Sequence, residues 1–215
     1  TTGYIVPTLL SIGRRYGDTA LAERGRRMLD WLASIQFPEG GFQGGMIGQE
    51  PVVPVTINNR QILMGLSAGT RQLGEMYREP MRGAADWLTR TQDPDGCWLS
   101  QPTPFAKPGE KAYETHVAWG LIEAFRTEEN EAWRAAAQPN VEGALDQQSE
   151  TGCYDRCCHT DPDNPLTHTL GYVHRGVVEA WRLSGVSRYL EAAVRTAAGL
   201  LSVQRADGSL PGRLG

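Results

Sequence analysis

The sequence repeats with a period of about 56 residues, and this periodicity constrains the fold more than any other feature. A glutamine recurs at this interval without a gap, and a glycine follows each glutamine four positions later. Two positions beyond each glycine stands an aromatic residue or, in the last copy, a leucine. The recurring residues are Gln36, Gln92, Gln148 and Gln204, then Gly40, Gly96, Gly152 and Gly208, then Phe42, Trp98, Tyr154 and Leu210. A register kept four times predicts four copies of one structural unit packed in a row.

Each unit is predicted to hold two helices and no strand of consequence, so the fold class is all-α. Apolar residues such as Met28, Leu32 and Ile35 recur at helical spacing. Trp31 and Trp87, which occupy equivalent positions, are expected in the core. The first helices are expected at 3–16, 58–74, 114–128 and 167–184, and the second helices at 20–36, 77–92, 131–148 and 187–204. Short connections within a unit make its two helices antiparallel neighbours.

Three long connections join the units, at 37–57, 93–113 and 149–166. Long loops in a compact domain are usually functional or disordered. Because all three occupy the same part of the repeat, we expect them on one face, at the N-terminal ends of the first helices. The recurring glycines are expected to supply the left-handed turn beyond each second helix. This face is where we expect the functional site.

The composition disfavours several classes of function. The chain has 215 residues, of which 40% are hydrophobic and 21% charged, so it can bury a sizeable core. Its net charge of −4 includes no basic block, so neither a nucleic acid nor an anionic membrane is expected as a partner. No apolar stretch is long enough for a transmembrane helix.

The cysteines and the start of the chain bear on location. Four cysteines, of which Cys157 and Cys158 are adjacent, do not resemble a secreted disulfide framework. The first residues, Thr1 to Tyr4, do not resemble a signal peptide and lack an initiator methionine. We therefore expect a cytoplasmic protein whose true N-terminus has been lost.

Helical hairpins of this length that end in Gln-x-x-x-Gly-x-aromatic resemble those of the α/α toroids. That group includes six-hairpin glycosidases, sugar epimerases, prenyltransferase β subunits, terpene cyclases and lanthionine-synthetase-like proteins. A closed six-hairpin ring of such units would need about 336 residues. We therefore expect a single domain over 1–215, either an open arc or part of a larger ring, with repeats at 1–56, 57–112, 113–168 and 169–215. Exposed apolar edges would then favour self-association.

Two segments are similar to uncharacterised bacterial toroid proteins of exopolysaccharide gene clusters. One runs from Thr1 to Pro7, and the other is Pro165-Leu166-Thr167-His168-Thr169 with Arg175-Gly176 downstream. The resemblance implies a role with sugar polymers. It favours a carbohydrate-active protein that hydrolyses, lyses or epimerises a sugar, with an oligosaccharide or another small molecule as ligand and no cofactor.

A second resemblance points to a different chemistry. The segment from Gln36 to Gly45 is similar to the glycine-rich loop of prenyltransferase β subunits, which use an Asp, Cys, His zinc site. One loop here holds soft ligands, with Cys153, Cys158 and His159 as the zinc candidates beside Asp155 and Cys157. Adjacent cysteines rarely bind one zinc ion together, and the Asp-x-Asp-Asp motif of terpene cyclases is missing. A zinc-dependent transferase is therefore the alternative, and a non-catalytic binding module is a third.

The starts of the first helices differ among the repeats although the glutamines and glycines do not. In register they read Thr2-Gly3-Tyr4, Asn58-Asn59-Arg60, Glu114-Thr115-His116 and Leu170-Gly171-Tyr172. This contrast indicates a functional role. The predicted catalytic residues are Glu114, His116, Asp155 and His168, with proton transfer by the first two. The predicted substrate-binding residues are Asn58, Asn59, Arg60, Trp98, Tyr113, Tyr154 and Arg175, where the arginines suit a carboxylate.

Structural explanations of the same residues stay open. Asn58 and Thr167 are typical helix N-caps, and Glu114 suits a helix N-terminus in its ionised form. His116 fits a buried core position. Arg60 and Arg175 can pair internally with Glu179 or Glu114, and the periodic aromatic residues after the glycines can simply fill the space between hairpins.

Overall fold

The computed structural model describes residues 2–101, 103, 112–158, 161 and 164–214. Within these ranges the chain forms eight α-helices and two short 3-10 helices, and its only β-type pairings are isolated bridges. The α-helices are α1 (Thr2–Tyr16), α2 (Thr19–Ser34), α3 (Thr56–Leu73), α4 (Arg78–Arg90), α5 (Thr115–Glu128), α6 (Glu131–Asp146), α7 (Thr167–Ser184) and α8 (Ser187–Ser202). The 3-10 helices are η1 (Glu75–Tyr77) and η2 (Ala112–Glu114). The all-α prediction is confirmed, and every predicted helix end lies within two residues of the observed one.

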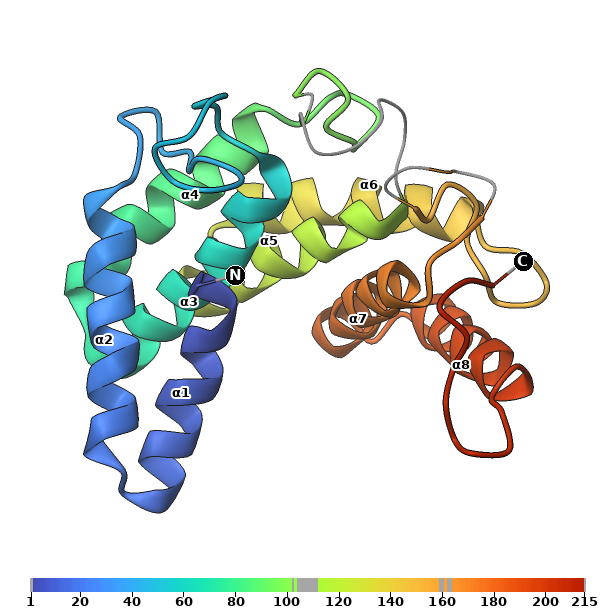
Figure 1. Ribbon diagram of the computed structural model, residues 1–215. Helices are drawn as coiled ribbons and strands as arrows, with labels where there is room; N and C mark the ends of the chain where they lie inside the picture. Colours follow the sequence, from blue (N-terminus) through green and yellow to red (C-terminus); the bar gives the residue numbers. More distant parts are fainter. Residues whose placement is uncertain (1, 102, 104–111, 159–160, 162–163, 215) are drawn as a thin grey trace.

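The helices form four antiparallel hairpins arranged as an arch (Figure 1). The first helix of each hairpin lies on the concave side and packs against the first helix of the next hairpin, in the order α1, α3, α5 and α7. We call these the inner helices; α2, α4, α6 and α8 form the outer layer. The described parts of the long connections run along one edge of the arch, at the N-terminal ends of the inner helices.

The recurring glutamines join each hairpin to the next. The Nε2 atom of Gln36 donates to the carbonyl oxygens of Gly40 and Pro80, at 2.9 Å in both cases. Gln92 repeats this pattern on Gly96 (3.0 Å) and Ala136 (2.8 Å). We call the bond from the loop to the next outer helix a glutamine bridge. It explains why a glutamine is kept at this position.

The third and fourth copies vary the pattern. Gln148 donates to the carbonyl of Ala192 (2.8 Å) on α8 and to the hydroxyl of Tyr154 (3.1 Å). Gln204 keeps the local bond to Gly208 (2.8 Å), but it is exposed and makes no bridge to an outer helix within the described residues. The fourth copy therefore shows the turn without the bridge.

Glycine is required at these recurring positions for two reasons, the backbone angle and the close packing. The φ angles of Gly40, Gly96 and Gly152 are 93°, 85° and 85°, which confirms the predicted left-handed turn. A Cβ atom at Gly96 would lie 2.8 Å from the carbonyl carbon of Pro139 on α6. The turn thus brings the loop backbone against the next outer helix, where only glycine fits.

The aromatic residues after these glycines lie in the core. Phe42, Trp98 and Tyr154 are at most 2% exposed. Trp87 is also buried, but Trp31 is 43% exposed, so the prediction that both tryptophans lie in the core is wrong for Trp31. Trp87 lies under the loop of the preceding hairpin, because a Cβ atom at Gly41 would approach its indole nitrogen to 3.1 Å. The described residues place no such loop over Trp31.

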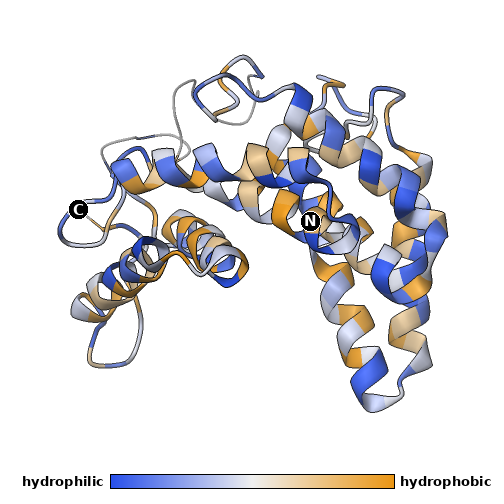
Figure 2. Cartoon of the chain, turned by 180° about the vertical axis from the view of Figure 1, so that it is seen from behind, coloured by the Kyte–Doolittle hydropathy of each residue, from blue (hydrophilic) through white to orange (hydrophobic). Residues whose placement is uncertain are grey.

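Both ends of the arch expose apolar side chains. Ile5 and Ile12 on α1 are 42% and 41% exposed, and Val194 and Leu201 on α8 are 59% and 68% exposed. Figure 2 shows hydrophobic residues along α1 at one end of the arch. None of the helices in the described part of the chain has the length and apolar character needed to cross a membrane.

Candidate functional site

One position of the repeat brings four side chains together on the inner helices. Tyr4, Arg60, His116 and Tyr172 occupy this position in successive copies and lie in the first two turns of α1, α3, α5 and α7. Because the inner helices pack in register, these side chains lie at one height and touch. We call this set the aromatic–arginine layer.

Arg60 lies at the centre of the layer, between two tyrosines. Its guanidinium carbon is 5.7 Å from the ring centroids of both Tyr4 and Tyr172. The His116 ring stacks on Tyr172 with centroids 4.5 Å apart and 12° between the planes. Tyr4 meets the His116 ring edge-on at 5.8 Å. The electron-rich faces of the tyrosines stabilise the positive charge of Arg60.

Arg60 is completely buried and has no carboxylate partner within the described residues. Its Nη1 atom lies 3.4 Å from Nε2 of His116 and 3.8 Å from the sulfur of Met64. Its Nε and Nη2 atoms find no hydrogen-bond partner in the part of the chain that the structure describes. Burial lowers the pKa of Arg60 to about 9, which still leaves it charged at neutral pH. The internal ion pair considered for Arg60 is therefore not formed with any described carboxylate.

His116 is also fully buried and is neutral. Burial, reinforced by the charge of Arg60, lowers the pKa of His116 to about 2. Arginine can only donate hydrogen bonds, so Nε2 of His116 accepts and the ring proton sits on Nδ1. This Nδ1 atom has no acceptor among the residues described. General acid–base catalysis needs a pKa near the working pH, so the geometry favours a hydrogen-bonding role for His116 over the predicted proton transfer.

The next turn of the inner helices adds a second stacked pair. Trp119 and Arg175 again share one position of the repeat, and the guanidinium carbon of Arg175 lies 4.5 Å from the Trp119 ring centroid. The Trp119 ring also contacts the His116 ring at 5.0 Å. Arg175 is half-exposed, whereas Trp119 is buried. This pair continues the aromatic–arginine layer toward the C-terminal ends of the inner helices.

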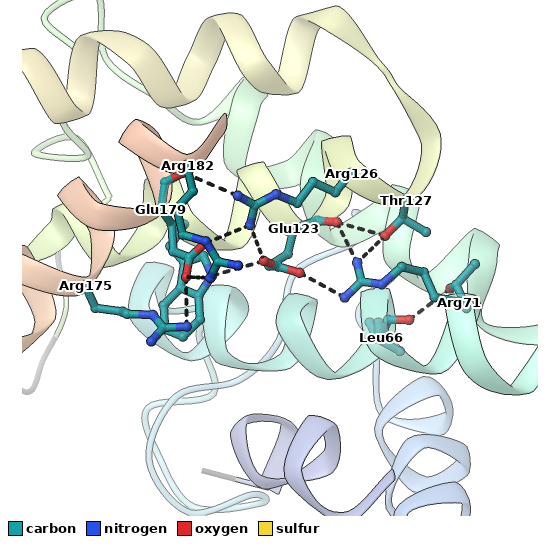
Figure 3. Close-up of polar contacts among 10 residues, drawn as sticks. Leu66, Arg71, Glu123, Arg126, Thr127, Arg175, Glu179 and Arg182 are labelled. Atoms are coloured by element: carbon teal, nitrogen blue, oxygen red, sulfur yellow. Dashed lines mark hydrogen bonds and ion pairs between the residues drawn. The ribbon is translucent and has the colours of Figure 1, made fainter. Parts of the chain in front are cut away.

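A network of arginines and glutamates follows one turn further along (Figure 3). Glu179 is buried on α7 and accepts from Arg126 (2.8 Å), Arg175 (2.8 Å) and Arg182 (3.2 Å). The internal pairing of Arg175 with Glu179, one of the alternatives considered from the sequence, is thus formed.

Glu123 on α5 occupies the position equivalent to Glu179 and continues the network. It pairs with Arg71 of α3 (2.9 Å) and with Arg126 (2.7 Å). Burial alone would raise the pKa of Glu123, but the two arginines outweigh burial and lower it. Both glutamates therefore link neighbouring inner helices through ion pairs.

The aromatic–arginine layer and the adjoining arginine–glutamate network together carry a surplus of positive charge, and we call the two together the inner stripe. The described stripe holds five arginines and two glutamates, while His116 is neutral. The arginines are Arg60, Arg71, Arg126, Arg175 and Arg182, and the glutamates are Glu123 and Glu179. The whole chain has a net charge of −4. These seven residues, of which Arg60 and Glu179 are buried, thus carry a local surplus of three positive charges on an acidic protein, and such a surplus attracts anions.

The other predicted catalytic residues lie at different distances from this layer. Glu114 is half-buried at the end of η2, two residues before His116. His168 is exposed in the first turn of α7, and its ring meets that of Tyr172 edge-on at 5.8 Å. Asp155 is exposed in the turn after α6, and no contact among the described residues connects it to the layer. The structure therefore brings His168 to the layer and places Glu114 beside it in sequence.

The predicted asparagines hold the start of α3. The side-chain nitrogen of Asn59 donates to the carbonyls of Val55 (3.0 Å) and Phe42 (3.3 Å), which ties the loop to the helix. Asn58 is half-buried and lies inside α3, whose N-cap residue is Val55. Thr167 lies inside α7, and its hydroxyl donates to the carbonyl of Pro211. The N-cap interpretation of Asn58 and Thr167 is therefore wrong.

The predicted aromatic contacts are not brought to the layer. The indole nitrogen of Trp98 donates to the carbonyl of Leu88 (2.9 Å), and the Tyr154 hydroxyl accepts from Gln148, so both rings fill the core. Their position matches the space-filling alternative. The side chain of Tyr113 lies outside the described residues.

The cysteine loop offers little to a metal ion in its described part. Cys153 is half-buried, Cys157 and Cys158 are buried, and His159 lies outside the described residues. Burial raises the pKa of Cys157 to about 12, which favours the thiol over the metal-binding thiolate. No group of three metal-ligating side chains occurs among the residues that the structure describes.

Sequence reasoning missed Arg71, whose equivalent in the next repeat is Thr127, and it also missed Trp119, Glu123, Arg126 and Arg182. The signal was present, because three further pairs of residues lie one full repeat apart. They are Trp119 and Arg175, Glu123 and Glu179, and Arg126 and Arg182. Continuing the repeat register along each inner helix, beyond its first turn, would have found them.

Comparison with solved structures identifies the architecture. An unsaturated glucuronyl hydrolase specific for heparin has a TM-score of 0.78 and 15% identity, covering 99% of this chain and 59% of that chain. The chain has the α/α-toroid fold. A GH76 α-mannanase from Bacteroides thetaiotaomicron has a TM-score of 0.76 and 11% identity, over 100% of this toroid and 60% of that chain. A cellobiose 2-epimerase from Bacillus thermoamylovorans has a TM-score of 0.75 and 10% identity, over 99% and 65%.

This toroid spans less than two thirds of the length of each of these three structures. No protein-family model matches the sequence, and no curated protein matches it either. At these identities the likeness establishes the fold, and function has to be argued from the site.

Proposed function

We propose that this toroid is a carbohydrate-active protein of the glycoside hydrolase, lyase or epimerase type, and that its substrate binds at the N-terminal ends of the inner helices. The observation that carries the proposal is the aromatic–arginine layer. The repeat keeps its glutamines and glycines in all four copies but places Tyr4, Arg60, His116 and Tyr172 at one shared position. Aromatic rings and a few convergent polar groups are typical of small-molecule sites. The similar solved structures include two glycoside hydrolases and a sugar epimerase.

The roles follow from exposure and position. Glu114 lies at the N-terminal end of α5, where the helix dipole stabilises its ionised form and suits it to act as a base or nucleophile. His168 is exposed beside Tyr172, so its imidazole is accessible to a ligand and serves as the second acid or base. Asp155 is the alternative partner. His116 orients Arg60, and the two tyrosines of the layer contact the sugar ring.

The transferase alternative has less support. An isoprenoid chain needs an apolar cavity, whereas the described inner stripe holds five arginines and two glutamates. The buried thiol of Cys157 also favours its protonated form. The proposal therefore involves a sugar ligand and no resident cofactor, while the cytoplasmic location remains a prediction from sequence.

A ligand screen followed by a turnover assay tests the proposal. The purified chain is heated with neutral oligosaccharides, uronates, prenyl diphosphates, and zinc or a chelator, and a sugar is expected to raise its melting temperature. The stabilising sugar is then incubated with wild type, Glu114→Gln and the control Glu191→Gln, which changes an exposed glutamate on α8. We expect Glu114→Gln to lower turnover at least about a hundredfold without loss of binding. Stabilisation by a prenyl diphosphate alone, or equal turnover by both variants, would reject the proposal.

A further inference from the structure

The aromatic–arginine layer contains three buried hydrogen-bond donors that have no acceptor among the described residues. They are Nε and Nη2 of Arg60 and Nδ1 of His116. Buried polar groups in folded proteins nearly always have a partner, and a buried arginine nearly always has an anionic one. On these two neighbouring side chains every group left without a described partner is a donor, which indicates a ligand that supplies the acceptor.

The arrangement of the free donors selects the shape of the ligand. In a guanidinium group, Nε–H and Nη2–H lie along one edge and point in the same direction. In Arg60 no described residue accepts a hydrogen bond from this edge, whereas the opposite nitrogen, Nη1, contacts Nε2 of His116 at 3.4 Å. An edge with two parallel N–H groups matches the two oxygens of a carboxylate in a bidentate pair.

The residues described around Arg60 stabilise its charge, but none of them accepts a hydrogen bond from its free edge. Tyr4 and Tyr172 offset the charge of Arg60 through their ring faces, which provide no acceptor oxygen to its free edge. The two glutamates of the neighbouring network are engaged by other arginines. The described inner stripe keeps a surplus of three positive charges, which favours the approach of an anion.

We propose that the ligand of this toroid is an acidic sugar, a uronic acid or an oligosaccharide that contains one, and that the free edge of Arg60 binds its carboxylate. This inference rests on the proposed carbohydrate function and adds the substrate class to it. His116 is a positioning residue, because its Nε2 atom fixes the orientation of the guanidinium group. Arg60 itself is fully buried, so the proposal requires a neighbouring side chain to move aside when the carboxylate binds. Of the two tyrosines 5.7 Å from its guanidinium carbon, Tyr4 is the more exposed, at 39%.

The test compares a sugar acid with its own uncharged form. Isothermal titration of the wild-type chain is carried out with glucuronate and galacturonate, with the amides of the same two acids, and with the neutral parent sugars. Sugar phosphates and sugar sulfates form a further arm, because they carry anions of a different shape. We expect each uronate to bind at least about tenfold more tightly than its amide. Equal binding of acid and amide, or tighter binding of the phosphates, overturns the inference.

Variants then assign the preference to one side chain. Arg60→Met keeps the apolar length of the side chain and removes its charge, a change that buried sites often tolerate. Arg24→Met removes the same charge from an exposed position on α2 and is the matched control. The preference for acid over amide should vanish in Arg60→Met and persist in the control. Arg60→Lys keeps the charge but lacks the two parallel N–H groups, so it should retain a reduced preference for acid over amide. This variant separates the effect of charge from that of geometry if Arg60→Met does not fold.

The outcomes distinguish the two proposals. If neutral sugars bind and the acids show no preference, the acidic-sugar inference fails and the carbohydrate function stands. If no sugar of either kind binds, the proposed function itself fails.

Discussion

The glutamine bridges make a quantitative prediction, because the repeat supplies its own control. Gln92 and Gln204 occupy the same position of the repeat and make the same local bond, to the carbonyls of Gly96 (3.0 Å) and Gly208 (2.8 Å). Of these two, only Gln92 adds a bridge across the described hairpins, to the carbonyl of Ala136 at 2.8 Å. Truncation of each to alanine therefore removes the same turn bond, and only Gln92→Ala also removes the bridge.

The magnitudes follow from the net value of a hydrogen bond, about 1 kcal/mol, and from the extra cost of leaving a part-buried carbonyl without this partner. We expect Gln92→Ala to lower the free energy of unfolding by about 2 to 3 kcal/mol, and Gln204→Ala to lower it by about 0.5 to 1 kcal/mol, because Gln204 is exposed. In a chain of this size the larger loss corresponds to a decrease in Tm of about 4 to 12 °C.

The assay is urea unfolding followed by circular dichroism, with wild type and both variants measured at one protein concentration. Equal slopes of free energy against urea show that the variants unfold the same surface. If the two variants lose the same stability, the bridge contributes nothing beyond the turn, and it cannot be the reason why the glutamine recurs without a gap.

Three further predictions concern single residues. Gly152→Ala should lower the free energy of unfolding by about 2 to 4 kcal/mol, because Gly152 has a φ of 85° and a Cβ atom there would meet the α8 backbone. Gly48 has a similar φ of 81° but lies in open space, so Gly48→Ala should cost only about 1 kcal/mol. Thermal melts that show equal losses would contradict this. Cys157 should resist alkylation at pH 8 in the folded protein and react after unfolding, because burial raises its pKa to about 12. Rapid alkylation of Cys157 in the folded protein, detected by mass spectrometry, would disprove this prediction. For His116 the folded pKa of about 2 lies below the unfolded value, so its stabilising contribution is complete above about pH 6.5 and is lost as the pH falls. Between pH 7.5 and pH 5.0 the free energy of unfolding, measured with urea, should fall by about 2 kcal/mol less in His116→Gln than in wild type. Identical decreases would count against a buried neutral ring.

The helices and their order could be predicted from the sequence because the signals are local and repeated. Glutamine, glycine and an aromatic residue, or leucine in the last copy, recur together beyond each outer helix, and apolar spacing defines the rest. The error at Trp31 has a tertiary cause. Its equivalent, Trp87, is buried by a loop from the preceding hairpin, and apolar periodicity within a helix carries no information about such a cover.

The site could be predicted only in part. The repeat register places Tyr4, Arg60, His116 and Tyr172 at equivalent positions, so their shared location follows from the sequence. Their mutual orientation does not follow from the sequence, because it depends on how the inner helices approach one another and on which side-chain rotamers this packing allows. The protonation of His116 and the free edge of Arg60 arise from that packing.

The repeat divides its positions between two tasks. The glutamines and glycines near the loops hold neighbouring hairpins together, whereas the side chain at the shared inner position varies from copy to copy. Each hairpin can therefore change what it presents to a ligand without altering the bonds that join it to its neighbours. An ancestral chain of identical hairpins would have had a uniform lining. Independent substitution at residues 4, 60, 116 and 172 is a short mutational route from that lining to an asymmetric one, as binding a ligand in a single orientation would require.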